Sequence, residues 1–264
     1  MTLHAVITGD PHAAVPLVLL HGFGGGAFVW RDVIDRLPAD LPVIAYDLPG
    51  HAGSLHAEGL GGAGRMAKAI LSDLDRRGIP AFHLAGHSLG GATAALIALR
   101  QPQAVPSLTM VAPGGFGPEI NHRVLERFGL AETAEELRSA LEIMVGYNFD
   151  IPETMIEATL EARRGEGARE ALSTVFSAIV SANSETGPAQ GQLPLADILA
   201  LPMPKALLWG LEDCILPPHQ SAVSGSSLAV HRLPGAGHML VDECPDIVAE
   251  EILRTVRRVE ATVS

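Results

Sequence analysis

The 264-residue chain is poor in aromatic residues, in cysteine and in basic charge, and each shortage excludes a class of protein. Aromatic residues make up 4% of the chain, so we expect any pocket to be lined mainly by Leu, Met, Val and Ala. Two cysteines, Cys214 and Cys244, are too few for a disulfide framework and favour reduced thiols. The net charge of -12 argues against a nucleic-acid partner, because phosphate binding requires a basic face.

Targeting signals, membrane segments and metal motifs are also missing. The N-terminal "MTLHAVITGD" has no basic region followed by an apolar one, and no apolar run approaches the length of a membrane span. We therefore expect a cytoplasmic protein with no membrane partner, and the sequence leaves a homo-oligomer open. The 11 histidines form no tight ligand spacing, so we expect neither a metal nor an organic cofactor.

Short apolar runs alternate with longer helical patterns along most of the chain. The expected strands are 3–8, 17–20, 43–46, 82–85, 107–112, 205–209 and 228–233, and the expected helices are 27–37, 63–77, 90–100 and 245–260. Strands that alternate with helices form a parallel sheet covered on both faces. We therefore expect an α/β fold with a mostly parallel, doubly wound sheet, whose functional groups lie at the carboxyl ends of strands.

Residues 118–198 interrupt this alternation. They contain helical stretches such as "AEELRSALEIMVGY" and no convincing strand, and they end in the loop-like "SANSETGPAQGQLP". We interpret them as a helical cap inserted into a core domain made of residues 1–117 and 199–264. The alternative is a set of extra helices without a role at the site. Several large side chains of this segment could contact a substrate or form the cap's own core: Phe128, Met144, Tyr147, Phe149, Met155 and Phe176.

The glycine-rich stretch "LAGHSLGG" at residues 84–91 places a serine between an expected strand and an expected helix. Glycine weakens both kinds of element, so three glycines here require a reason. A nucleophile on a sharp strand-to-helix turn supplies one, because small neighbours let the backbone pass close to the hydroxyl of Ser88. The alternative is a serine that caps the following helix.

A serine hydroxyl needs a base to accept its proton, and the base needs an acid to orient it. "LPGAGHMLVDE" places His238 in a glycine-rich turn directly after the last expected strand. "LLWGLEDCILP" places Asp213 after the preceding strand, with Glu212 as its neighbouring competitor. Asp242 and Asp246 follow the histidine and fit less well, because the acid precedes the histidine in chain order in this arrangement.

An oxyanion site requires two backbone N–H donors that point at one place. We expect one from Leu89, directly after the serine, and one from Phe23 in "HGFGGG", the loop after the strand 17–20. A phosphate-binding loop is the alternative for "HGFGGG". This loop lacks the G-K-[ST] ending of such sites and does not match G-x-G-x-x-G.

The motifs "HGFGGG", "DLPGHAGS", "GHSLGG", "WGLEDCILP" and "GAGHM" follow the order found in α/β hydrolases, and the chain resembles this family over nearly its whole length. The resemblance implies a catalytic triad of Ser88, Asp213 and His238 and an oxyanion hole at Phe23 and Leu89. Residues 86–121 are similar to the hydrolase-like domain of acetoin dehydrogenase acyltransferase components, which carry a lipoyl domain upstream. We expect no lipoyl domain here, because the hydrolase strands start at once.

The expected function is a serine hydrolase that cleaves a small or medium, mainly apolar carboxylic ester through an acyl-serine. One competing function is that of a carbon–carbon bond hydrolase of the meta-cleavage type. Those enzymes resemble one another in an Arg beside the acid and a Trp after the histidine, where this chain has Cys214 and Met239. The sequence also leaves open an acyltransferase and a non-catalytic partner of a dehydrogenase complex.

Overall fold

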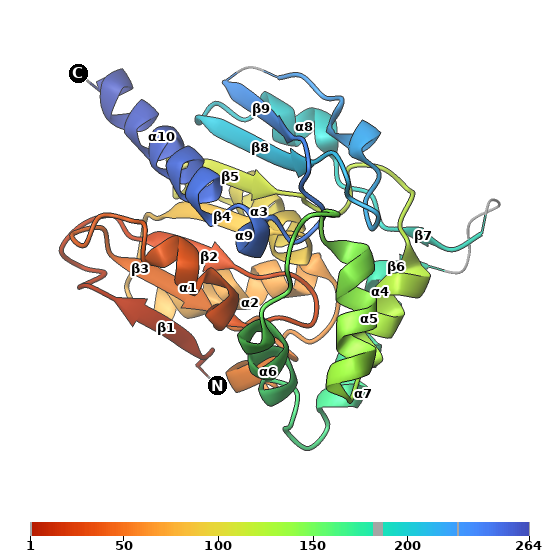
Figure 1. Ribbon diagram of the computed structural model, residues 1–264. Coiled ribbons are helices and arrows are strands. Elements are labelled where there is room, and N and C mark those ends of the chain that lie inside the picture. The colour runs from red at the N-terminus through yellow and green to blue at the C-terminus, as the bar shows by residue number, and fades with distance from the viewer. Residues whose placement is uncertain (1, 182–186, 226, 264) are drawn as a thin grey trace.

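A seven-stranded sheet forms the centre of the computed structural model, which describes residues 2–181, 187–225 and 227–263 (Figure 1). Its strands are β1 (Ala5–Thr8), β2 (Leu17–Leu20), β3 (Val43–Tyr46), β4 (His83–His87), β5 (Leu108–Val111), β8 (Lys205–Gly210) and β9 (Leu228–Leu233). They lie in the order β1-β3-β2-β4-β5-β8-β9, and only β1 runs antiparallel to its neighbour. The expected mostly parallel α/β sheet is confirmed.

Strand β2 shows why its sequence, "LVLL", has no polar position. Val18 and Leu20 belong to one apolar cluster, whereas Leu17 and Leu19 belong to a second one. Successive side chains of a strand point to opposite faces, so the two clusters are the two faces of the sheet. A parallel strand that is covered on both sides must be apolar at every position.

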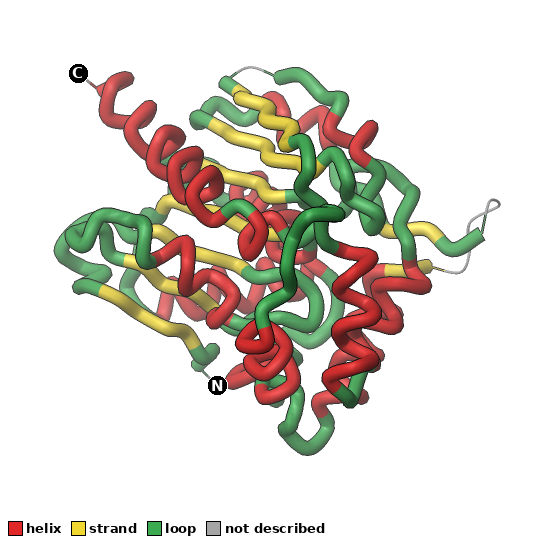
Figure 2. The backbone as a smooth tube through the Cα atoms, viewed as in Figure 1, coloured by secondary structure: helices red, strands yellow, loops and turns green. Residues whose placement is uncertain are grey.

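Helices cover both faces of the sheet (Figure 2). On one face lie α2 (Ala63–Arg76), α3 (Leu89–Arg100) and α8 (Leu195–Ala200), and on the other lie α1 (Arg31–Ile34), α9 (Leu240–Glu243) and α10 (Pro245–Val263). The expected helix over 27–37 is shorter and split, with a 3-10 turn at Ala27–Trp30 before α1. After α1 the chain continues in tighter turns, in which the N–H groups of Arg36 and Leu37 donate to the carbonyl oxygens three residues earlier, and Pro38 disfavours a helical conformation at the residue before it.

Four helices come from the segment that interrupts the strand–helix alternation. They are α4 (His122–Leu130), α5 (Ala134–Met144), α6 (Glu153–Glu161) and α7 (Ala168–Ile179). Figure 1 shows them grouped at one side of the sheet, beyond the ends of β4 and β5. The expectation of no strand in this segment was wrong, because β6 (Val180–Ser181) and β7 (Ala189–Gln190) pair antiparallel. Two-residue strands are too short to produce an alternating pattern.

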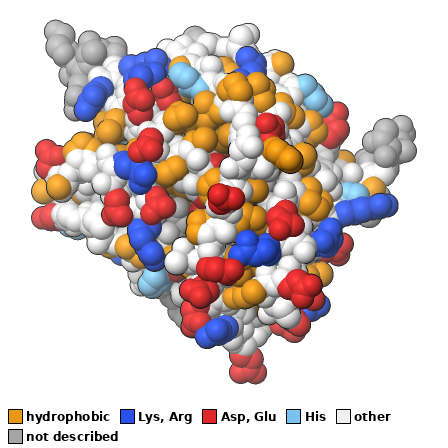
Figure 3. Space-filling view, in the orientation of Figure 1, with side chains coloured by type: hydrophobic (Ala, Val, Ile, Leu, Met, Phe, Trp, Pro, Cys, Tyr) orange, Lys and Arg blue, Asp and Glu red, His pale blue; other side chains and the backbone are white. Residues whose placement is uncertain are grey.

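The surface carries both signs of charge. Figure 3 shows acidic and basic side chains interspersed with apolar ones over the viewed face. Acidic residues outnumber basic ones by 30 to 18 over the whole sequence. Among the described residues, no helix is both long enough and apolar enough to cross a membrane.

Candidate active site

Ser88 lies on the turn between β4 and α3 in a strained backbone conformation. Its φ is 53° and its ψ is -115°, a region that L residues rarely adopt. The turn is closely packed, since a Cβ at Gly90 would lie 2.2 Å from the carbonyl oxygen of Leu20. Only glycine fits there, which answers why the sequence surrounds the serine with glycines. The strain holds the serine side chain out above the sheet edge.

The structure brings His238 and Asp213 to Ser88 from loops far apart in the chain. The Nε2 atom of His238 lies 3.0 Å from Oγ of Ser88, and its Nδ1 atom lies 2.8 Å from Oδ2 of Asp213. The side chains of His238 and Asp213 are almost completely buried. Because Nδ1–H donates to the carboxylate, Nε2 is left as an acceptor for the serine proton.

The loop after β8 fixes the carboxylate of Asp213. Its Oδ1 atom accepts hydrogen bonds from the backbone N–H groups of Ile215 and Leu216, both at 2.8 Å. Oδ2 is thereby left for His238. Each carboxylate oxygen of Asp213 thus has its own donors, two backbone N–H groups for Oδ1 and the imidazole for Oδ2. The carboxylate is therefore fixed in one orientation.

The other acidic candidates lie elsewhere. Glu212 accepts a hydrogen bond from the backbone N–H of Tyr147 at 2.7 Å, and Asp246 pairs with Arg36 at the surface. Asp242 lines a small cavity next to His238, where burial and the nearby Glu243 raise its pKa to about 7. None of the three forms a described hydrogen bond with His238.

The loop after β2 packs directly against the serine. A Cβ at Gly22 would lie 2.9 Å from Nδ1 of His87 and 3.2 Å from Cβ of Ser88. Phe23 follows Gly22, and both Phe23 and Leu89 line the space around Ser88. Within the described ranges, no acceptor is paired with the backbone N–H of Phe23 or Leu89. These two backbone N–H groups are therefore free to donate to a group bound beside Ser88.

Two buried histidines, His21 and His87, hold the loop after β2 and the loop that carries His238 in place. Nδ1–H of His21 donates to the carbonyl oxygen of Gly22 at 2.7 Å, and its Nε2 accepts from Leu48 N–H at 2.9 Å. Nε2–H of His87 donates to the carbonyl oxygen of His238 at 2.8 Å. Burial lowers the pKa of His21 to about 4 and that of His87 to about 3, so both stay neutral at pH 7.

Glu243 is a supporting residue that sequence reasoning missed. Its Oε2 atom accepts from the N–H groups of Gly237 and Gly146, both at 2.7 Å. It therefore joins the loop of His238 to the end of α5, where the carbonyl oxygen of Met144 also accepts from His238 N–H at 2.6 Å. No motif marks this role, because both donors are backbone groups brought close only by folding.

Arg163 joins the loop of Phe23 to the helical segment. Its guanidinium donates to the carbonyl oxygens of Gly24 and Phe128, at 2.9 Å and 2.6 Å, and lies 4.5 Å from the centre of the Phe128 ring. Burial lowers its pKa to about 10, so the side chain remains charged at pH 7. Its position in the loop between α6 and α7 gave no signal in the sequence.

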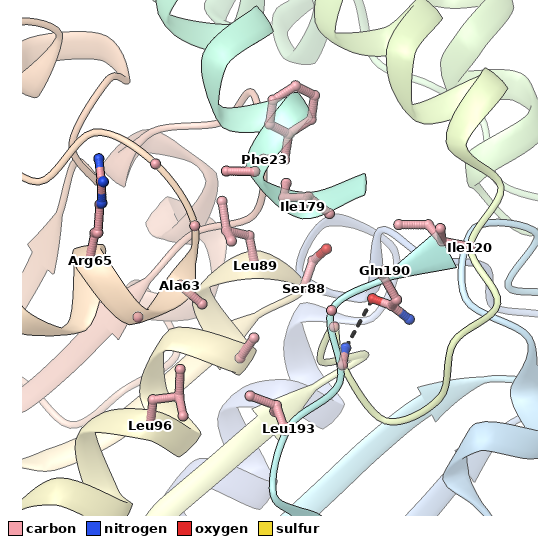
Figure 4. Close-up of a pocket in the computed structure, with 18 of the residues that line it drawn as sticks. Phe23, Ala63, Arg65, Ser88, Leu89, Leu96, Ile120, Ile179, Gln190 and Leu193 are labelled. Carbon is pink, nitrogen blue, oxygen red and sulfur yellow. Dashed lines mark hydrogen bonds between the residues drawn. The ribbon is translucent and has the colours of Figure 1, made fainter. Parts of the chain in front are cut away.

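Two cavities meet at Ser88. The larger has a volume of about 660 Å³ and lies between α2, α3 and α7, as the labelled residues of Figure 4 show. The smaller, of about 130 Å³, lies on the side of His238. Four of the large side chains singled out in the sequence line the smaller cavity, namely Phe128, Met144, Phe149 and Met155. Tyr147 is 92% exposed and Phe176 packs on the apolar core, so neither lines a cavity at the site.

The cysteines and the acidic side chains form no further centre in the described structure. Cys214 and Cys244 are both free. Among the described residues, no group of three or more His, Cys, Asp or Glu side chains could hold a metal ion. The groups that the structure brings together at this site are a serine, an imidazole, a carboxylate and backbone N–H groups.

A mostly parallel sheet with a serine on the sharp turn after a central strand defines the architecture of α/β hydrolases. Residues 17–251 match the alpha/beta hydrolase family, and the chain belongs to it. The fold predicted by resemblance is therefore confirmed.

Known proteins of several activities share this fold. The chain is 34% identical over 243 residues to the dihydrolipoyllysine-residue acetyltransferase component of the acetoin cleaving system of Pseudomonas putida, covering 92% of this chain and 64% of that protein. It is 25% identical to human monoacylglycerol lipase ABHD6, covering 96% of this chain and 79% of the lipase. A variant of the meta-cleavage product hydrolase CumD of Pseudomonas fluorescens IP01 superposes with a TM-score of 0.80 at 20% identity, covering 96% of this chain and 93% of that one.

Proposed function

We propose that the protein is a serine hydrolase that cleaves small or medium, mainly apolar carboxylic esters, with Ser88, His238 and Asp213 as its triad. The observation that carries this proposal is the 3.0 Å distance between Nε2 of His238 and Oγ of Ser88, on a strained turn beside two unpaired backbone donors. One fold can host many unrelated activities, so the site rather than the fold supports the proposal.

The first half-reaction forms an acyl-serine. His238 Nε2 takes the proton of the Ser88 hydroxyl while Oγ attacks the ester carbonyl carbon. The carbonyl oxygen becomes an oxyanion and accepts hydrogen bonds from the N–H groups of Phe23 and Leu89. As the oxyanion collapses, the bond to the alcohol oxygen breaks, and His238 gives its proton to the departing alcohol.

The second half-reaction releases the acid. His238 removes a proton from a water molecule, whose oxygen attacks the acyl carbon. The bond to Ser88 Oγ then breaks, and the serine recovers its proton from His238. The carboxylate of Asp213 stabilises the imidazolium in both halves. We further propose that residues 118–198 act as a cap, because their helices supply Phe128, Met144 and Met155 to the smaller cavity.

Labelling with a fluorophosphonate probe tests the nucleophile. The unmodified protein should label and hydrolyse p-nitrophenyl esters, whereas Ser88→Ala should not label and should lose about 10⁴-fold in kcat. Ser107→Ala is the matched control, since that buried hydroxyl bonds His83 and lies outside both cavities. Absence of labelling in the folded parent protein, or equal rates for Ser88→Ala, would refute the proposal.

A second pair of variants tests the acid. Asp213→Asn should lower kcat by about 10⁴-fold, because an amide cannot hold the imidazole in the reactive tautomer. Glu212→Gln should retain most activity, because the described hydrogen bond of the Glu212 carboxylate is to the backbone N–H of Tyr147 and not to His238. The reverse result would move the role of acid to Glu212.

Acyl transfer is the second candidate, and the similarity to the Pseudomonas putida acetyltransferase component favours it. In that reaction a thiol or alcohol replaces water in the second half-reaction. Adding dihydrolipoamide during turnover of p-nitrophenyl acetate distinguishes the two. A transferase yields the S-acetyl thiol in excess of acetate, whereas a hydrolase yields acetate at every thiol concentration.

A further inference from the structure

The larger cavity next to Ser88 has an apolar interior and a cationic edge. Its lining includes Arg65, Lys68 and Arg100, and none of the described residues that line it is Asp or Glu. The chain as a whole has 30 acidic and 18 basic residues. The charged residues that line this cavity in the described structure are all cationic, whereas the chain as a whole is acidic.

Helix α3 shows how the cationic edge relates to the serine. Leu89, Ala92, Leu96 and Arg100 all line the cavity, and their spacing of three and four residues places them on one face of the helix. The 12-residue helix is about 18 Å long. The apolar part of the face therefore begins at the serine, and the cation lies at its far end.

Helix α2 completes this edge. Nη1 of Arg100 donates to the carbonyl oxygen of Gly64 in the first turn of α2, at 2.9 Å. Arg65 and Lys68 follow on the same helix, three residues apart and hence on neighbouring positions of its surface. Figure 4 shows Arg65 at the side of the cavity away from Gln190.

None of these three cations is neutralised within the described chain. Seven other arginines form ion pairs with carboxylates there, namely Arg36, Arg76, Arg77, Arg138, Arg164, Arg169 and Arg254. By contrast, no described Asp or Glu lies within ion-pair distance of Arg65, Lys68 or Arg100. Unneutralised cations that face a cavity are available to a ligand.

We propose that the larger cavity selects esters in which one half is an extended apolar chain that ends in an anionic group, a carboxylate or a phosphate. This inference rests on the proposed hydrolase activity. The chain would lie along Leu89, Leu96, Ile179 and Leu193, with its carbonyl at Ser88. The anion would accept hydrogen bonds from the guanidinium groups, whose planar donors match carboxylate and phosphate oxygens.

Paired substrates of equal length test this selectivity. The probes are mono-p-nitrophenyl sebacate, its methyl-capped neutral counterpart, and p-nitrophenyl ω-phosphooxydecanoate. The corresponding ω-carboxyalkyl acetates place the anion on the alcohol half instead. The readout is the ratio of kcat/KM for the anionic ester to that for its neutral counterpart, which cancels effects of a variant on the chemical step.

The expected variant effects follow from charge pairing. An exposed ion pair contributes up to a factor of about five, so Arg100→Gln should lower the ratio up to about fivefold. The triple variant Arg65→Gln, Lys68→Gln, Arg100→Gln should lower it by roughly 10- to 100-fold. Rising sodium chloride should lower the ratio in the parent protein. Arg257→Gln, an arginine of α10 outside both cavities at Ser88, should leave it unchanged.

The outcomes separate this inference from the proposed function. If Ser88 labels and the neutral ester is hydrolysed, but the triple variant keeps the parent's ratio with all anionic esters, the inference is overturned and the hydrolase function stands. If no ester is hydrolysed, the hydrolase function fails. The anion site is then tested by calorimetric binding of sebacate monomethyl ester, which the triple variant should lose and Arg257→Gln should keep.

Discussion

Replacing Glu243 tests whether the loop of His238 is held by two backbone hydrogen bonds. Oε2 of Glu243 accepts from the N–H groups of Gly146 and Gly237, both at 2.7 Å. Glu243→Ala leaves both donors without a protein acceptor. An unsatisfied buried donor costs about 1–3 kcal/mol, so the free energy of unfolding should fall by about 2–6 kcal/mol.

Glu243→Gln separates the hydrogen bonds from the charge. A glutamine oxygen can still accept from both donors, but a neutral acceptor forms bonds about half as strong as a charged one. The free energy of unfolding should therefore lie between those of the parent and Glu243→Ala. Burial raises the pKa of Glu243, although hydrogen bonds from the N–H groups of Gly237 and Gly146 oppose this shift, so all variants are compared at the same pH.

Two assays on the same protein complete the test. Urea unfolding gives the stability, and p-nitrophenyl acetate turnover gives kcat, which should fall in the same order because Gly237 precedes His238. Glu250→Ala is the control, since it removes a carboxylate of α10 that pairs with Arg254 at the surface, and should cost less than about 1 kcal/mol. A Glu243→Ala protein as stable and as active as the parent would refute the reasoning.

Three further changes have distinct expected results. Gly90→Ala places a Cβ 2.2 Å from the carbonyl oxygen of Leu20 and should lower the free energy of unfolding by about 3 kcal/mol or more. Gly64→Ala is its control, because the nearest atom lies 3.5 Å from the added Cβ, and equal losses in urea unfolding would contradict this expectation. Arg163→Met should lower kcat, because it frees the carbonyl of Gly24 beside Phe23, and Arg163→Lys should recover part of it; unchanged kcat in both would argue against a positioning role. The pKa of Asp242 is raised to about 7, so the folded protein keeps a proton that the unfolded chain loses near pH 4, and the free energy of unfolding falls as pH rises from about 4 through 7. The gain in Tm from Asp242→Asn should therefore be larger at pH 8 than at pH 5, and an equal gain would count against the raised pKa.

The parallel sheet could be predicted because its signals are local. Runs such as "LVLL" and "VIAY" are apolar at every position, and a strand covered on both faces requires this. The short pair β6 and β7 escaped detection because two residues show no period, and the helix expected over 27–37 is cut short near Pro38.

The sequence by itself determined the order of the motifs along the chain and the tight turn at Ser88, because glycine spacing and strand-to-helix patterning act within a few residues. The sequence favoured Asp213 but left its neighbour Glu212 as a competitor, and the tertiary structure separates them because, of the two side chains, only that of Asp213 points at His238. The tertiary structure also decided the roles of Glu243, Arg163 and the cations around the larger cavity. Glu243 and Arg163 bond to backbone groups, and the cations face a cavity. Neither arrangement produces a recognisable pattern in the amino-acid sequence.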